Sequence, residues 1–163
     1  MNGDTASAGA LLDAVRAGAA APGGRIEIGV CPPFPYLALA AQRLEGAGVG
    51  CGAQNLSQHD NGAYTGEVSA TMLVDLGCRF VIVGHSERRA LFGETDALVA
   101  AKVAQAARHG LVPIVCVGET LDERERSAAE DVLARQIDAL GASVRGLDAT
   151  RLVVAYEPVW AIG

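Results

Sequence analysis

Short runs of β-branched residues alternate with stretches rich in alanine and leucine along this chain, and that alternation restricts its fold more than any other feature. The pattern is typical of parallel strands joined by crossover helices. The five predicted strands cover residues 25–30, 49–54, 79–83, 112–117 and 151–156. The predicted helices cover residues 5–20, 35–45, 69–76, 95–108 and 127–140. Because most of each strand is apolar on both faces, we expect an α/β fold whose sheet is covered by helices.

Composition narrows the class of protein. With 163 residues, half of them apolar, the chain has the composition of one soluble globular domain over residues 1–163. A formal charge of −6 and an aromatic content of 4% argue against a nucleic-acid partner. The longest uncharged stretch, residues 28–42, contains three prolines and is too short for a membrane span, which needs about 20 apolar residues. Four cysteines without paired spacing predict reduced thiols in a cytoplasmic protein.

Two polar segments stand out between the predicted elements. Residues 54–68, with the sequence QNLSQHDNGAYTGEV, form the longest predicted loop. A loop of this length within a compact domain is usually functional, although a plain surface excursion is the alternative. Residues 119–126, with the sequence ETLDERER, alternate in charge and predict a solvated segment leading into a helix.

The candidate chemistry lies where predicted strands end, because ligands of parallel α/β proteins bind at the carboxyl ends of the strands. His85 follows the strand in VIVGHSERR, before a helix that Ser86 could cap, and Glu157 ends the strand in AYEPVWAIG. Alone, each could be a structural histidine or a solvated glutamate. Together they could divide a proton transfer next to a carbonyl. The apolar residues 159–162 suit a lid over such a site, whereas His59 and His109 have no comparable context.

Five strings of the sequence resemble the triosephosphate isomerase family, in order and with suitable spacing. They are GHSERR at 84–89, AYEPVWAIG at 155–163, GAYTGEVS at 62–69, CPPFPYL at 31–37 and CVGET at 116–120. The resemblance implies a (β/α)8 TIM barrel, of which this chain would cover about five strands. It also implies the glycolytic and gluconeogenic interconversion of dihydroxyacetone phosphate and D-glyceraldehyde 3-phosphate through an enediolate, without metal or organic cofactor.

The same resemblance assigns roles to single residues. Glu157 would be the base and His85 the neutral imidazole that polarises the carbonyl, with Ser86 and Glu87 in supporting positions. Gly163 would be a lid glycine whose backbone N–H reaches the substrate phosphate.

The remaining assignments concern the lid and its surroundings. Trp160 and Ile162 would anchor and cover the lid, while Glu119 and Tyr156 would exchange hydrogen bonds with the tryptophan. Cys116 matches a cysteine packed near the base, and a buried small apolar side chain is the equal alternative.

The resemblance also gives the long loop a role in forming a dimer. In the family, the segment that matches residues 54–68 inserts into a twofold-related subunit, which would place Thr65 at the tip with Tyr64 beside it. The resemblance therefore implies a homodimer with a self-complementary contact.

The chain also departs from the family pattern. An asparagine and a lysine that the family carries at the end of its first strand have no counterpart, since the sequence starts at Met1-Asn2-Gly3. The only lysine, Lys102, is expected to be solvated on a helix far from the site. The phosphate-binding loops after the seventh and eighth family strands also have no counterpart.

We therefore expect an internal segment of a longer isomerase that is inactive by itself. The alternative is a catalytically inactive remnant that acts only by association, through its long loop or its open strand edges. A different phosphate-sugar barrel enzyme is a third reading, and it requires the string AYEPVWAIG to be coincidental.

Overall fold

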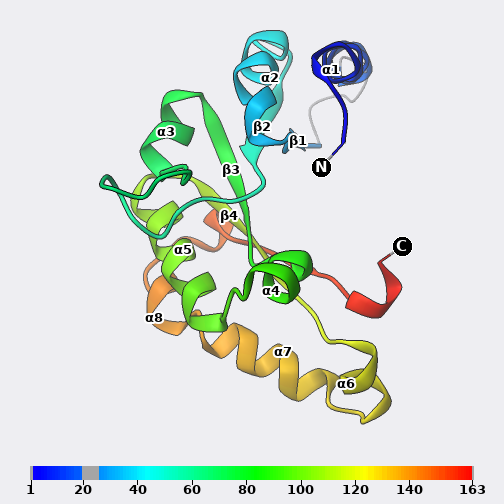
Figure 1. Ribbon diagram of the computed structural model, residues 1–163, viewed down its shortest axis with the longest axis vertical. Coiled ribbons are helices and arrows are strands. Elements are labelled where there is room, and N and C mark those ends of the chain that lie inside the picture. Colours follow the sequence, from blue (N-terminus) through cyan, green and yellow to red (C-terminus); the bar gives the residue numbers. More distant parts are fainter. Residues whose placement is uncertain (1, 20–25, 163) are drawn as a thin grey trace.

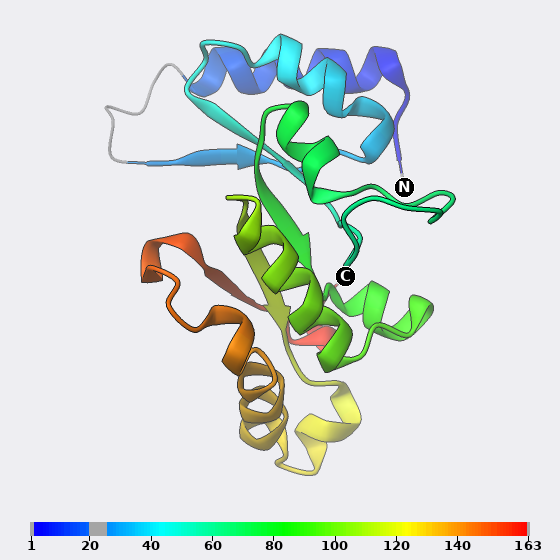
Figure 2. The ribbon, with the colours of Figure 1, turned by 90° about the vertical axis from the view of Figure 1, so that its left-hand side faces the viewer.

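The computed structural model describes residues 2–19 and 26–162. Its centre is a parallel sheet of five strands that lie in chain order. The sheet curls into part of a barrel with helices along its outer side (Figures 1 and 2). The prediction of about five parallel strands joined by helices is confirmed.

The strands are β1 (Ile28–Val30), β2 (Val49–Ala53), β3 (Cys78–Val83), β4 (Val112–Val117) and β5 (Val153–Tyr156). The longer helices are α1 (Thr5–Ala19), α2 (Leu37–Arg43), α4 (Ser86–Phe92), α5 (Asp96–Arg108) and α7 (Ala129–Asp138). The shorter ones are α3 (Ala70–Asp75), α6 (Leu121–Glu125) and α8 (Gly141–Val144), with the 3-10 turns η1 (Phe34–Tyr36), η2 (Ala149–Arg151) and η3 (Val159–Ala161).

Hydroxyl side chains fix the starts of three helices. Ser69, Thr95 and Thr120 each accept a hydrogen bond from a backbone N–H in the first turn of α3, α5 and α6. The predicted helix at 35–45 is divided instead, because a proline-containing 3-10 turn precedes α2. Helix α4 is the helix expected after His85, although no range was predicted for it, and α6 lies in the segment 119–126 that was expected to lead into a helix. Helix α8, with four residues, was not predicted, since it spans too few turns to give a clear periodicity.

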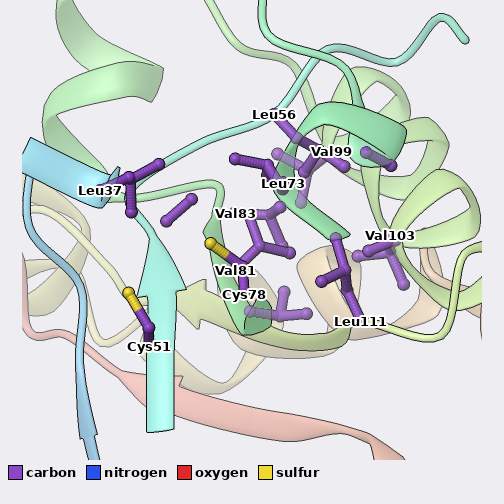
Figure 3. Close-up of a cluster of buried hydrophobic side chains, with 14 of the residues drawn as sticks. Leu37, Cys51, Leu56, Leu73, Cys78, Val81, Val83, Val99, Val103 and Leu111 are labelled. Carbon is purple, nitrogen blue, oxygen red and sulfur yellow. The ribbon is translucent and has the colours of Figure 1, made fainter. Parts of the chain in front are cut away.

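The core lies between the outer face of the sheet and the helices (Figure 3). Leu37 of α2, Leu73 of α3 and Val103 of α5 are fully buried, in one cluster with Val81 and Val83 of β3. Burying one such side chain contributes about 1.5–3 kcal/mol. The helices thus hold the three central strands in place, and with them the loops at the strand ends.

The Phe80 ring of β3 lies over glycines of the two preceding strands. A side-chain carbon at Gly29 would lie 3.1 Å from the Phe80 ring, and one at Gly50 would lie 2.3 Å from it. At Gly52 the added carbon would lie 2.9 Å from the Cβ atom of Phe80. The glycines of β1 and β2 therefore make room for the aromatic side chain of β3.

The outermost strands differ from the prediction. Strand β5 is not covered on both faces, since Val153, Val154 and Tyr156 are each about half exposed. Both edge strands are also shorter than predicted: β1 begins at Ile28 and β5 at Val153. Residue Arg25 of the predicted first strand and Ala20 of the first helix lie outside the described residues.

The prediction for Lys102 is wrong. Its side chain is buried, with only 4% of the residue exposed, and its Nζ atom lies 2.5 Å from Oε1 of Glu94 and 2.7 Å from Oδ1 of Asn55. Arg88 contacts the same Glu94 oxygen at 2.5 Å. Helix α5 therefore turns its lysine inward, where a buried carboxylate receives it.

Candidate active site

The carboxyl ends of β3, β4 and β5 bring the predicted site residues together. His85 follows β3, Glu119 follows β4 and Glu157 follows β5. The backbone N–H of Glu157 donates to Val117 O at 2.7 Å, and that of Val159 donates to Glu119 O at 3.0 Å. The β4–β5 ladder thus continues past the strands and holds Glu157 beside the end of β4.

The His85 and Glu157 side chains are in direct contact. Nε2 of His85 lies 2.9 Å from Oε1 of Glu157. Nδ1 of His85 accepts a hydrogen bond from the backbone N–H of Glu87 at 3.3 Å, so in the neutral ring the proton is on Nε2. The backbone around α4 therefore selects the tautomer that donates toward the carboxylate.

Ser86 and Glu87 support this pair through their backbones. The N–H of Ser86 donates to Oε2 of Glu157 at 3.2 Å, so both carboxylate oxygens are engaged. The prediction that Ser86 caps the helix is wrong, because His85 is the N-cap and Ser86 is the first residue of α4. The Glu87 side chain is mostly exposed, with Oε2 at 3.8 Å from Nδ1 of His85.

Cys116 lies on β4 next to the carboxylate. The thiol is buried and hydrogen-bonds to Glu157. Burial, reinforced by the negative charge of Glu157, raises the pKa of Cys116 to about 12. Both descriptions considered from sequence therefore apply: the residue is packed near the carboxylate, and it is an inert buried thiol.

Glu119 forms a second polar centre beneath η3. Its side chain is fully buried and accepts hydrogen bonds from Nε1 of Trp160 at 2.9 Å and from the Tyr156 hydroxyl at 3.1 Å. The hydrogen bond from Trp160 lowers the pKa of Glu119 and, with that from Tyr156, outweighs the opposing effect of burial. The predicted contacts among these three residues are thus present in the structure.

The predicted lid, residues 159–162, is tied to this centre through Trp160. Residues Val159–Ala161 form η3, and Trp160 and Ile162 are each about half exposed. The guanidinium of Arg124 lies over the Trp160 ring, 5.6 Å from its centroid. Gly163, the predicted phosphate-binding glycine, lies outside the described residues.

Sequence reasoning missed two residues that fasten the strand ends. Nε of Arg89 donates to Gly84 O at 2.8 Å, while its NH2 group donates to Cys116 O at 3.3 Å, which joins the ends of β3 and β4. The side chain of Gln136 makes two hydrogen bonds to the backbone of Gly118. The sequence signal for Gln136 was its position four residues after the apolar Val132, which places both on the same face of α7.

The long loop leaves the body of the structure (Figure 2). Thr65 and Tyr64 are exposed near its end, and the Tyr64 ring stacks on His59 at a centroid distance of 4.1 Å. The Asp60 carboxylate in the loop contacts three side chains near the end of α5, those of Gln105, Arg108 and His109. His109 therefore has a structural partner in Asp60.

Comparison with known proteins settles the family. A family model described as "Triosephosphate isomerase" matches residues 1–163. The chain belongs to the triosephosphate isomerase family. The five-stranded sheet is accordingly part of a (β/α)8 TIM barrel, as the sequence motifs implied.

Individual triosephosphate isomerases are similar over the whole chain. The enzyme of Thiobacillus denitrificans is 56% identical over 163 residues, and that of Herminiimonas arsenicoxydans is 52% identical over 163 residues. The enzyme of Nitrosococcus oceani is 54% identical over 164 residues. These alignments include all of this chain but only 64% to 65% of each relative. The chain thus spans just under two thirds of the length of the triosephosphate isomerases that it matches.

The site offers proton-transfer groups rather than metal ligands. The described site residues place the Glu157 carboxylate opposite Nε2 of the His85 imidazole. Among residues 2–19 and 26–162, no cluster of three or more histidine, cysteine, aspartate or glutamate side chains could hold a metal ion.

In the same part of the chain, no helix is long and apolar enough to cross a membrane.

Proposed function

We propose that this chain carries the proton-transfer pair of a triosephosphate isomerase, which interconverts dihydroxyacetone phosphate and D-glyceraldehyde 3-phosphate. The observation that carries the proposal is the 2.9 Å contact between Nε2 of His85 and Oε1 of Glu157, with the proton held on Nε2. Membership of the family supports the same substrate class. Under this proposal, the protein is a cytoplasmic enzyme of glycolysis and gluconeogenesis.

Each group has one task in the reaction. The Glu157 carboxylate removes the carbon-bound proton next to the substrate carbonyl and returns it to the neighbouring carbon. The Nε2–H of His85 donates to the carbonyl oxygen as the enediolate forms, and the imidazole takes up the proton of the neighbouring hydroxyl, so that one O–H proton moves between the two oxygens while one C–H proton moves between the two carbons. Because Ser86 and His85 occupy both carboxylate oxygens, Glu157 must release one of these contacts to reach the substrate.

The lid completes the site in this proposal. Residues 159–162 exclude water over the reacting atoms, and Gly163 contributes a backbone N–H to the phosphate. Trp160 fixes the base of the lid by its hydrogen bond to the buried Glu119. The two proton-transfer groups lie within this chain, whereas full phosphate binding calls for the rest of the barrel that the longer relatives possess.

The test is kinetic and uses a chimaera. Residues 1–163 replace the matching segment of the Thiobacillus denitrificans relative, which supplies the remaining third of a barrel. Glu157→Asp should then lower kcat about 100-fold or more with little change in KM, because the base is displaced while phosphate contacts remain. Glu130→Asp makes the same chemical change on the exposed start of α7 and should leave kcat unaltered.

An unchanged kcat in Glu157→Asp would refute the role of the carboxylate. A chimaera that folds but has no isomerase activity would refute the proposed function and favour a remnant that acts by association. The isolated 163-residue chain, assayed beside the chimaera, shows how much of the activity needs the rest of the barrel.

A further inference from the structure

Gln136 is a polar residue that α7 turns inward. Only 5% of it is exposed, and both polar atoms of its side-chain amide bond to one backbone unit. Its Oε1 accepts from the N–H of Gly118 at 2.9 Å, and its Nε2 donates to the carbonyl of Gly118 at 3.1 Å. In the described part of the structure, no other side chain makes hydrogen bonds to both the N–H and the carbonyl of Gly118.

The position of Gly118 explains why such a partner is needed. The β3–β4 ladder ends at the pair Val83 and Val115, so β3 has no partner for Gly118. The flanking carbonyls of Val117 and Glu119 point the other way, toward β5. A side-chain amide offers the same donor and acceptor as a peptide group, so Gln136 takes the place of a missing neighbouring strand.

Gly118 in turn bears directly on Glu157. A Cβ atom at Gly118 would lie 1.7 Å from the backbone oxygen of Glu157, so the two residues meet backbone to backbone. Hydrogen bonds from the N–H of Glu157 to Val117 O and of Val159 to Glu119 O bracket the contact on both sides. A shift of Gly118 therefore moves the backbone that carries the Glu157 carboxylate.

We propose that Gln136 is a positioning residue for Glu157, acting through Gly118 to set the carboxylate against His85. This inference rests on the proposed function only for its kinetic consequence. The geometric part, that Gln136 fixes the His85–Glu157 contact, stands without any activity.

Three variants test it. Gln136→Leu keeps the size of the side chain and removes both hydrogen bonds. Gln136→Glu leaves an acid that, when neutral, can still donate to the Gly118 carbonyl and accept from its N–H, and that loses the donor when ionised. Val132→Ala is the matched control, since Val132 lies one turn earlier on α7 with the same 5% exposure, and its truncation weakens the packing of the helix while both hydrogen bonds of Gln136 to Gly118 are kept.

The first measurement is the ¹⁵N spectrum of the His85 ring in the 163-residue chain. In the parent and in Val132→Ala we expect a protonated, hydrogen-bonded Nε2. In Gln136→Leu that signal should shift or broaden as Glu157 moves away. In Gln136→Glu it should match the parent below about pH 5 and depart from it as the acid ionises. Spectra of both Gln136 variants that match the parent at every pH would overturn the inference.

The second measurement is steady-state kinetics in the chimaera. Gln136→Leu should lower kcat about 10- to 100-fold with KM nearly unchanged, whereas Val132→Ala should change neither. For Gln136→Glu, the kcat relative to the parent should fall as pH rises. An active parent whose kcat is insensitive to Gln136 would overturn the kinetic part of the inference. An inactive parent contradicts the proposed function instead, and the His85 spectrum still decides the positioning role.

Discussion

Lys102, Glu94 and Arg88 form a charge cluster between α4 and α5, in which Glu94 and Lys102 are buried and Arg88 is partly buried. Both cations contact Oε1 of Glu94, and Lys102 also reaches Asn55 at the start of the long loop. Burial tends to raise the pKa of Glu94, but the hydrogen bonds from Lys102 and Arg88 outweigh it and lower the pKa. The carboxylate is therefore ionised in the folded chain, and its stability depends on its two partners.

Removal of the lysine should be costly. Lys102→Met leaves the buried carboxylate with one cation, and we expect the free energy of unfolding to fall by about 3–5 kcal/mol. Arg126→Met removes a cation from an exposed pair with Asp122 and should cost less than about 1 kcal/mol. Urea denaturation of both variants measures the difference. Equal losses would show that the cluster is no stronger than a surface pair.

Glu119 should make stability depend on pH. Because its pKa is lowered in the folded chain, it adds stability above its ordinary value of 4.5, and that stability is lost as pH falls through the folded pKa. Glu119→Gln should therefore be less stable than the parent at neutral pH, with a gap that narrows below about pH 4.5. Thermal unfolding across this range measures the gap. A gap that is constant with pH would contradict the assignment.

Strand-end motifs made His85 and Glu157 predictable, because strand ends could be located from the apolar runs. The contacts that bury Lys102 and Gln136 were not predicted, since they depend on how the helices pack in the fold. Nevertheless, Lys102 lies on the same face of α5 as the buried Val99 and Ala106. A single cation within such an apolar stripe was a sign of burial that residue type alone concealed.

At the scale of elements, the close approach of β4 and β5 permits only glycine at residue 118. Gly118→Ala would place a methyl group 1.7 Å from the Glu157 carbonyl oxygen, and backbone must move to admit it. We expect a loss of about 3 kcal/mol or more in the free energy of unfolding. Gly18→Ala, on α1 with open space around it, should instead raise stability by about 0.5–1 kcal/mol. Thermal melts that show both variants alike would contradict the contact.

The central strands were predicted to within one residue at either end, because their apolar runs match the length of their ladders. The edge strands were predicted too long. Ile26 continues the β-branched residues of β1 toward the N-terminus, but the pairing with β2 starts only at Ile28. Pairing, rather than propensity, therefore decides where an edge strand starts.

At the scale of the whole molecule, the structure is a curled sheet with one long loop reaching outward (Figure 1). The sequence motifs predicted the barrel fold, but they could not predict which strand faces remain exposed to solvent. That outcome depends on which elements pack against β5, and Val153 and Val154 remain half exposed.

The loop predicts an assembly. If residues 54–68 enter a second subunit, Thr65→Arg should place a charged, longer side chain in the contact and weaken the dimer. Sedimentation of the chimaera should show a larger monomer fraction in this variant than in the parent. Thr71→Arg, an exposed position on α3 outside the loop, serves as the control. A dimer unaffected by the Thr65 change would refute this use of the loop.

The inward lysine gives the chain an uncommon chemical property. Reagents that acylate primary amines find a single side-chain target, Lys102, and it is enclosed by α5, α4 and the base of the loop. The folded chain should resist acylation at that residue, while every opening of the enclosure exposes it. The mass gained at Lys102 over time would therefore count the openings of this region, and the chain carries its own reporter of local unfolding without an added label.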